Sequence, residues 1–151
     1  MLSAFHTAYI VEDLDAYIAD AARAGLPFRW TPRLTMTVDA WTPEGRLSLE
    51  LAGHFSLDPI DRVEIIQAVS DSPWAGNLVS RAAFHHIGFW SDDLAADSTR
   101  LRGMGCQMAA TDGLDPEHPG TFTLHCGSLG AGYVQLVADS IRDALQRRLE
   151  A

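Results

Sequence analysis

Two stretches of the chain repeat one another at a constant spacing. The segment His6-Thr-Ala-Tyr-Ile-Val-Glu-Asp-Leu-Asp-Ala16 aligns with His86-Ile-Gly-Phe-Trp-Ser-Asp-Asp-Leu-Ala-Ala96, and every aligned pair is 80 residues apart. Each copy is followed by a helical pattern and, further on, by similar strand segments, Val63-Glu-Ile-Ile66 and Val134-Gln-Leu-Val137. The repeat therefore predicts two modules of the same design, packed into one structure.

The duplicated positions carry side chains that can bind a metal ion. They are His6, Glu64, His86 and Gln135. Two imidazoles, one carboxylate and one amide oxygen suit a borderline divalent ion, with two further positions left for water or substrate. The set does not choose between zinc, nickel, cobalt, manganese and iron. A single strand histidine is more often a structural polar residue, so it is the repetition that favours a metal site.

Length and charge limit the classes of protein that this chain can represent. With 151 residues, 47% of them hydrophobic, residues 1–151 suffice for one core, and we expect a single domain made of two small modules. The net charge of −9 argues against nucleic acid as a partner and is typical of a soluble protein. Cys106 and Cys126 form no C-x-x-C pair and indicate a reducing compartment.

Targeting signals are not recognisable in the sequence. The N-terminal segment has no basic region followed by an apolar stretch, and no apolar run approaches the roughly 20 residues of a membrane-spanning helix. We therefore expect a cytoplasmic protein without a membrane partner.

Alternation and turn residues predict the order strand, helix, strand, strand, strand for the first module, at about residues 4–68. The predicted strands are 5–10, 33–38, 46–51 and 61–67, and the predicted helix is 14–24. Asp13 is suited to cap the start of this helix and Gly25 to end it. Residues 54–60 are interpreted as a connector, because Pro59 should end any strand ladder.

The second module, at about residues 83–138, repeats this order. Its predicted strands are 84–90, 106–111, 121–126 and 133–137, with a helix at 93–104. A linker helix is predicted at about 70–80, where Asp71-Ser-Pro precedes Trp74, and a C-terminal helix at about 139–150. Residues 112–120 are rich in turn residues and lie where a flap fits.

Strand alternation sorts the side chains into an apolar and a polar face. The apolar face, expected to meet the helices, carries Leu34, Met36, Val38, Leu47, Leu49, Leu51, Phe122 and Leu124. The polar face carries Thr35, Thr37, Ser48, Glu50, Thr121, Thr123 and His125. We predict that the metal-ligating side chains share the polar face, which then lines a cleft inside a curved sheet.

These segments resemble the vicinal oxygen chelate superfamily, which includes glyoxalase I, methylmalonyl-CoA epimerase, extradiol dioxygenases and the fosfomycin and bleomycin resistance proteins. Residues 84–89 with Asp92-Asp-Leu94 are similar to the second-module opening of the glyoxalase and methylmalonyl-CoA epimerase branch, and residues 63–67 to its first-module closing strand. Residues 71–76 are similar to the segment that joins its modules. The similarity extends over residues 5–137.

The resemblance implies an α+β fold in which two βαβββ modules, related by a pseudo-twofold axis, form one curved mixed sheet around a metal cleft. It also implies that the metal ligands are His6, Glu64, His86 and Gln135, with the second histidine of the His85-His86 pair as the ligand. Most relatives have glutamate where this chain has Gln135. An amide can ligate through its oxygen but cannot accept a proton at neutral pH, which leaves Glu64 as the one acidic ligand.

The predicted function is that of a metal-dependent isomerase, epimerase or lyase acting on a small carbonyl-containing metabolite. The ion would hold a carbonyl or enolate oxygen while a carboxylate removes the proton from the adjacent carbon. Glu64 is the first candidate for the base and Glu50 the second, with a solvated strand residue as the alternative for Glu50. The resemblance gives His125 a role in binding or protonating substrate, with a structural hydrogen bond as the alternative.

Two other functions stay open. A binding or sequestration protein without turnover is one, although such relatives often lack the metal ligands. A ring-cleaving dioxygenase is the other, and Gln135 argues against it because the iron-binding carboxylate usually lies on that strand. The resemblance and four tryptophans, Trp30, Trp41, Trp74 and Trp90, also predict a homodimer. The tryptophans are interpreted as core or interface residues rather than as walls of the cleft.

Overall fold

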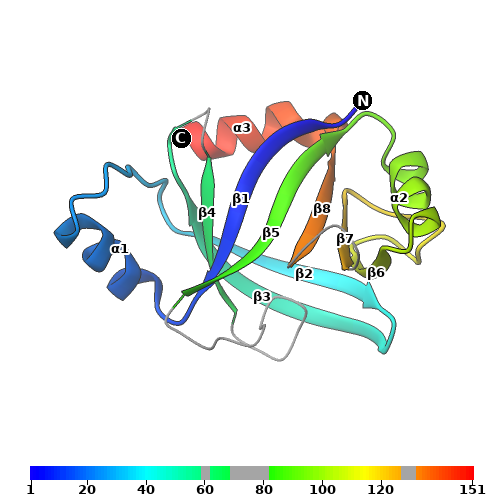
Figure 1. Cartoon of the computed structure of the whole chain (residues 1–151), viewed down its shortest axis with the longest axis horizontal. Helices are drawn as coiled ribbons and strands as arrows, with labels where there is room; N and C mark the ends of the chain where they lie inside the picture. Colours follow the sequence, from blue (N-terminus) through cyan, green and yellow to red (C-terminus); the bar gives the residue numbers. More distant parts are fainter. Residues whose placement is uncertain (59–61, 69–81, 127–131) are drawn as a thin grey trace.

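The computed structural model describes residues 1–58, 62–68, 82–126 and 132–151, and within these it has eight strands and three α-helices (Figure 1). The first module contains β1 (Ser3–Val11), α1 (Leu14–Arg23), β2 (Leu34–Thr42), β3 (Gly45–Phe55) and β4 (Val63–Ala68). The second contains β5 (Ala82–Ser91), α2 (Leu94–Gly103), β6 (Gln107–Thr111), β7 (Phe122–Cys126) and β8 (Tyr133–Ala138). A 3₁₀ turn, η1 (Asp139–Ile141), leads into α3 (Arg142–Glu150). The predicted α+β class and the repeated βαβββ order are confirmed.

The two module helices begin in the same way. Asp13 accepts a hydrogen bond from the Ala16 amide at 2.8 Å, and Asp93 accepts one from the Ala96 amide at 3.0 Å. Such side-chain caps satisfy amides that have no partner inside the helix. Gly25, two residues after α1 ends, has a φ of 73°, a left-handed conformation that glycine adopts without strain. The predicted start and stop signals of α1 are thus confirmed.

The strands close into a barrel in the order β1-β4-β3-β2-β6-β7-β8-β5. Within each module the first and last strands run parallel, β1 with β4 and β5 with β8. The modules meet where β1 and β5 pair antiparallel, in a register that places His6 opposite Gly88 and Ala8 opposite His86. The 80-residue repeat relates His6 to His86 and Ala8 to Gly88, so it converts one of these pairs into the other. The pseudo-twofold axis therefore passes between Thr7 and Ile87, the pair that lies between them.

The same axis relates the closing strands. Glu64 on β4 is in register with Ala8, and Gln135 on β8 is in register with Gly88. Because Gly88 is the repeat equivalent of Ala8, Glu64 and Gln135 occupy equivalent places in the two modules. The sequence repeat therefore corresponds to a structural repeat at the level of single residues.

The helices cover separate parts of the barrel (Figure 1). Leu14 of α1 packs with Val11 and Ile65, and Leu101 of α2 packs with Cys106 and Leu136. Leu149 of α3 packs in a third buried cluster, whose other members are Phe5, Phe55, Trp90 and Val137. A fourth cluster fills the barrel itself and consists of Ala8, Ile10, Ala40, Leu49, Leu51, Ile66, Ala110 and Leu124.

Some sequence-based boundaries differ from the structure. Strand β3 continues to Phe55 and includes His54, which was assigned to a connector, because the ladder with β4 pairs His54 with Ile65 and Phe55 with Glu64. The C-terminal helix is preceded by a 3₁₀ turn rather than beginning directly. The predicted linker helix at 70–80, with Trp74, lies outside the residues that the structure describes.

The prediction that the polar face lines the cavity is wrong for most residues of β2 and β3, although Thr37 and Thr121 of that face do line it. Leu34, Met36, Val38, Leu51 and Phe122 line the same cavity as His6 and Glu64, whereas Thr35, Ser48 and Glu50 are exposed on the outside. Leu34 and Phe122 of the apolar face do pack in the cluster that contains Leu149 of α3, as predicted, but they also line the cavity. In a closed barrel the interior is itself the apolar environment, and solvent covers the outer face of β2 and β3.

Candidate metal site and cavity

Three polar side chains converge inside the barrel from three adjacent strands. Nε2 of His6 on β1 lies 2.8 Å from Nε2 of His86 on β5, and Oε2 of Glu64 on β4 lies 3.0 Å from the first nitrogen and 3.6 Å from the second. Among the described residues these three form the one group of histidine, cysteine and carboxylate side chains able to hold a metal ion. The sequence prediction named all three.

The size of this triangle fits a divalent ion. Imidazole nitrogens and carboxylate oxygens lie about 2.0–2.2 Å from zinc, so donors on neighbouring coordination positions are separated by roughly 3 Å. The two shorter separations match that value, and a small rotation of the Glu64 side chain adjusts the third. The donor set, two imidazoles and one carboxylate, is one that zinc, iron, cobalt, nickel and manganese sites share.

The three ligand candidates are buried, and burial keeps His86 in the form that binds metal. The side chains of His6, His86 and Glu64 are 1%, 0% and 8% exposed. Burial, with the neighbouring His6 and His85, holds the pKa of His86 well below its usual value, and a hydrogen bond that the His86 ring donates to Gln135 opposes this shift only in part. His86 is therefore a neutral imidazole at physiological pH, with a lone pair free for a cation.

The two histidines differ in the support that they receive. Nδ1 of His86 lies 2.8 Å from Nδ1 of His85, whose ring stacks on Tyr133 at a centroid distance of 4.8 Å. This contact fixes the orientation of His86 so that Nε2 points at Glu64. Nδ1 of His6 is buried and has no hydrogen-bond partner within the described part of the chain. Its ring is held instead by edge contacts with Phe5 and Phe55.

Gly88 leaves the space that the His6 ring occupies. A Cβ atom at this position would come within 2.3 Å of Cε1 and 2.6 Å of Nδ1 of His6. The two residues are opposite one another in the β1–β5 ladder, so neither can shift without disturbing the pairing. Glycine at 88 is thus a steric requirement of this site, and sequence reasoning did not identify it.

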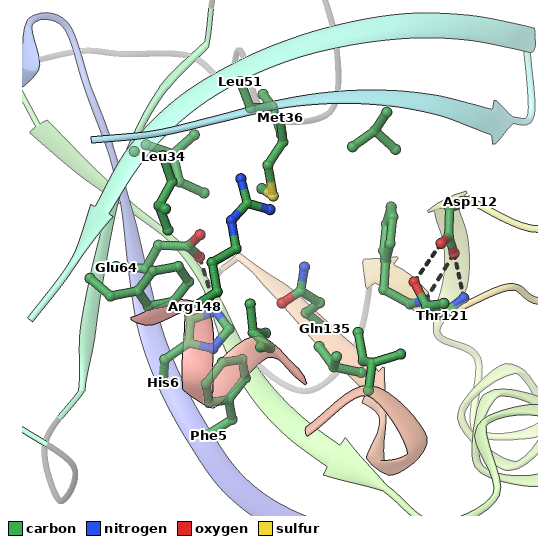
Figure 2. Close-up of a pocket in the computed structure, with 18 of the residues that line it drawn as sticks. Phe5, His6, Leu34, Met36, Leu51, Glu64, Asp112, Thr121, Gln135 and Arg148 are labelled. Carbon is green, nitrogen blue, oxygen red and sulfur yellow. Dashed lines mark hydrogen bonds and ion pairs between the residues drawn. The ribbon is translucent and has the colours of Figure 1, made fainter. Parts of the chain in front are cut away.

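Gln135 reaches the same place from β8. It hydrogen-bonds to His86 and lines the cavity beside His6 and Glu64 (Figure 2). The structure therefore brings the fourth predicted residue to the cluster. Ligation through its amide oxygen stays a prediction.

The cluster lies at the wall of a cavity of about 360 Å³. Most of the lining is apolar and comes from β2, β3, β7, β8 and α3. Its apolar members are Phe5, Leu34, Met36, Val38, Leu51, Phe55, Ile66, Phe122, Val137, Ile141 and Leu145. The polar members besides the cluster are Thr37, Asp112, Thr121 and Arg148. A volume near the lower end of the range for ligand sites indicates a small ligand.

Glu50 and His125 are not part of this cavity. Glu50 is exposed on β3, on the face opposite Leu51. His125 is buried on β7, where Nε2 lies 3.0 Å from the Thr123 hydroxyl, and burial lowers its pKa to about 4. Glu50 is therefore a solvated strand residue, and His125 takes part in a structural hydrogen bond. Of the tryptophans in the described residues, Trp90 is a core residue, and neither it nor Trp30 or Trp41 lines the cavity.

Hydrogen bonds of Asp112 join the two ends of the segment 112–120. Asp112 accepts hydrogen bonds from the Thr121 amide at 2.7 Å, the Phe122 amide at 2.9 Å and the Thr121 hydroxyl at 2.5 Å (Figure 2). Asp115 closes the tip by accepting from the His118 amide. Only the two ends, Asp112 and Thr121, reach the cavity lining. The loop therefore forms an edge of the cavity.

The contribution of α3 was not foreseen. The spacing of Ile141, Leu145 and Leu149 predicted this helix, but the residues that line the cavity are Ile141, Leu145 and Arg148. These positions lie on one side of a helix, next to the side that buries Leu149. The helical periodicity was thus sufficient to predict the helix, but the tertiary structure was needed to identify which side of it faces the cavity.

None of the helices in the described residues is long and apolar enough to cross a membrane.

Comparisons with solved structures give the fold. A variant of Streptomyces coelicolor methylmalonyl-CoA epimerase in complex with 2-nitronate-propionyl-CoA is 20% identical, with a TM-score of 0.61 over 91% of this chain and 98% of that chain. Methylmalonyl-CoA epimerase from Mycobacterium tuberculosis is 17% identical, with a TM-score of 0.56 over 94% and 91%. A mutant of 4-hydroxymandelate synthase from Streptomyces coelicolor is 16% identical, with a TM-score of 0.56 over 90% of this chain and 38% of that one.

At these identities the structural matches establish the fold alone, and no curated protein matches the sequence. The family assignment comes from the sequence itself. The profile of the Glyoxalase/Bleomycin resistance protein/Dioxygenase superfamily matches residues 5–123, which include the first module, the β1–β5 junction and His86. Together with the duplicated βαβββ barrel, this match shows that the chain belongs to the glyoxalase/bleomycin resistance protein/dioxygenase superfamily.

Proposed function

We propose that the protein is a metal-dependent isomerase, epimerase or lyase that acts on a small carbonyl-containing metabolite by removing a proton from the carbon next to the carbonyl. The observation that carries this proposal is the convergence of His6, His86 and Glu64 on one point at the wall of a largely apolar cavity. A substrate in that cavity has its reacting carbon beside a carboxylate and away from bulk water.

His6, His86 and Glu64 are the residues that would hold the metal, with Gln135 as the fourth candidate. A divalent ion bound there would supply Lewis acidity, which makes a carbonyl compound easier to deprotonate. Among the cavity-lining residues Glu64 is the carboxylate suited to the base role, because Asp112 already accepts three hydrogen bonds from its own loop.

Glu64 has two tasks in this scheme. A carboxylate that ligates a cation is a weak base, because the cation stabilises its charged form. With an ion bound, Glu64 would therefore need to accept the proton through an oxygen that is directed at the substrate and not at the ion. The electron pair of the broken C–H bond moves toward the carbonyl, and return of the proton to the carbon completes an isomerisation or epimerisation.

Deuterium exchange tests the proposal. A panel of small carbonyl compounds with an acidic α-hydrogen, beginning with methylmalonyl-CoA, is incubated with protein in deuterated water. We expect deuterium to enter at the carbon next to the carbonyl of at least one compound, and Glu64→Gln to abolish this exchange. Glu50→Gln is the matched control, since Glu50 is exposed outside the barrel. Exchange that survives in Glu64→Gln would refute the assignment of the base.

An iron-dependent oxygenase is the second candidate. Two histidines and one carboxylate on a shared site, with coordination positions left open, are the ligand set of many non-haem iron oxygenases. A mutant of 4-hydroxymandelate synthase is among the structural matches. Oxygen consumption by iron-loaded protein with a phenolic or 2-oxo acid substrate, without deuterium wash-in, would favour this function. A ligand-binding role without turnover predicts neither signal.

We further propose that the protein forms a homodimer. Phe84 and Ile87 on the outer side of β5 are 39% and 42% exposed, and Phe84 contacts the Tyr9 ring on β1 at a centroid distance of 6.1 Å. Exposed apolar side chains on adjacent strands favour contact with a second copy. Light scattering at micromolar concentration should give twice the mass of the chain, and a monomer mass would contradict this assignment.

A further inference from the structure

Arg148 supplies a positive charge to a cavity that is otherwise apolar or acidic. It is the one basic residue among the cavity-lining residues that the structure describes. The two lining carboxylates are Glu64, which belongs to the metal cluster, and Asp112, which is held by its own loop. The charge of Arg148 is therefore not matched by a carboxylate dedicated to it.

The contacts of Arg148 leave most of its guanidinium free. Its one hydrogen bond within the described residues runs from a terminal nitrogen to the Thr35 carbonyl, at 3.5 Å, and it takes part in no ion pair there. Arg142, at the start of the same helix, is paired: its guanidinium lies 2.6 Å from Asp139. A guanidinium has five donors arranged in a planar fork, so one long contact leaves the fork able to bind an oxyanion.

The position of Arg148 is set by a rigid element. Leu149, the next residue, is 2% exposed in the cluster formed with Phe5, Phe55, Trp90 and Val137, which fixes the last turn of α3. Figure 2 shows the Arg148 side chain extending from α3 across the cavity, between Glu64 and Met36. Arg148 is exposed as a whole residue, whereas His6 and Glu64 are buried.

From this arrangement we infer that Arg148 binds a carboxylate of the substrate, and that the substrate is an acid with an apolar body between that carboxylate and its reacting carbonyl. The inference rests on the proposed function, since it takes the cavity as the substrate site. A carboxylate matches the planar guanidinium by two parallel hydrogen bonds. The leucine, methionine and phenylalanine side chains that line the cavity favour carbon chains over hydroxylated ones.

The experiment compares two probes of equal length, hexanoate and hexanamide, by calorimetric titration of metal-stripped protein. Stripping prevents the probe carboxylate from binding a metal ion instead of Arg148. The unmodified chain should bind hexanoate more tightly than hexanamide. Arg148→Gln should weaken the binding of hexanoate about tenfold and leave the binding of hexanamide nearly unchanged. The expected size follows because a hydrogen bond to a charged group contributes about 1.5–3 kcal/mol, and 1.4 kcal/mol corresponds to a tenfold change in affinity.

Two variants control for structure. Arg147→Gln removes the same charge from the adjacent exposed position of α3, which does not line the cavity, and should leave the preference for hexanoate intact. Arg148→Lys should keep part of the preference, because it retains the charge but not the fork. Circular dichroism establishes that each variant is folded.

Several results would overturn the inference. They are no binding of hexanoate at millimolar concentration, an equal loss for both probes in Arg148→Gln, or the same loss in Arg147→Gln. Hexyl phosphate that binds more tightly than hexanoate with the same dependence on Arg148 would replace the carboxylate by a phosphate. Because the titration uses metal-free protein, a failure to bind metal would refute the proposed function while leaving the Arg148 result standing, and the converse also holds.

Discussion

The two modules place different residues at the same structural position. Glu64 lies in register with Ala8 in the parallel pair β1–β4, and Gln135 lies in register with Gly88 in the parallel pair β5–β8. A carboxylate can ligate a cation and accept a proton, whereas an amide can only ligate or form hydrogen bonds. The difference indicates that both modules contribute to one site but that only the first retains a group for proton transfer.

A second asymmetry runs in the opposite direction. His86, from the second module, is oriented by His85, whereas Nδ1 of His6 has no polar partner in the described chain. The position of His6 depends on packing and on the absence of a side chain at Gly88. The first module thus supplies the carboxylate of the cluster, and the second supplies the better-oriented imidazole and the space for the first histidine.

Exchanging Glu64 and Gln135 between the closing strands β4 and β8 tests the first asymmetry, and this change should have the largest effect. Glu64→Gln should reduce α-proton exchange by about 10²–10⁴-fold, the usual contribution of a general base. The double variant Glu64→Gln with Gln135→Glu should recover part of that loss, because it restores a carboxylate to an equivalent position across the pseudo-twofold axis. Exchange rates in deuterated water and metal content are measured together.

The control for this double substitution is Gln135→Glu alone. It adds a carboxylate to the cluster and should increase metal retention while leaving exchange within an order of magnitude of the unmodified chain. If the double variant is as inactive as Glu64→Gln although it binds metal, the two positions are not chemically equivalent. The comparison between the modules would then apply to the backbone alone.

The sequence repeat was sufficient to predict the modules and the convergence of His6, Glu64 and His86, because backbone register follows from a duplicated pattern. It was insufficient for the lining of the cavity. Whether an apolar strand face meets a helix or the inside of a barrel depends on closure of the sheet, which alternation does not encode. Glu50 was placed inside for this reason. Arg148 and Gly88 were missed because their roles depend on contacts between residues far apart in the chain.

The second asymmetry predicts unequal effects of substitution at Ala8 and Gly88. Gly88→Ala forces a methyl group against the His6 ring and, at the usual cost of overpacking of about 1–3 kcal/mol, should weaken metal binding by roughly tenfold or more. Ala8→Gly, at the equivalent position, should cost about 0.5–1 kcal/mol of folding stability and leave metal affinity unchanged. Competition titrations with a chelator measure the affinities. Equal metal affinities in the two variants would remove the steric role of Gly88.

A prediction that does not involve the metal site concerns His125, which lies in the second module away from the cavity. Its pKa is lowered from the usual 6.5 to about 4 by burial, so as the pH falls the unfolded chain takes up the proton before the folded chain does. The contribution of this residue is complete above the unfolded pKa and is lost as the pH falls toward 4. It amounts to about 2 kcal/mol between pH 7 and pH 5.

Urea unfolding of metal-stripped protein measures this effect. The difference in unfolding free energy between pH 7 and pH 5 should be smaller in His125→Asn by about the amount given above. His86 also has a lowered pKa and contributes in the same direction in both proteins, so the comparison isolates His125. An identical pH dependence in the two proteins would mean that His125 is not buried as the structure describes.

The central claim is that His6 and Glu64 of the first module and His86 of the second hold one metal ion between them. Elemental analysis of protein purified without chelator and supplied with divalent metals tests it directly, with His6→Ala and His86→Ala as the matched pair across the axis. The unmodified protein should contain about one ion per chain, and both variants should lose that ion. Negligible metal in the unmodified protein, or unchanged metal in either variant, would contradict it.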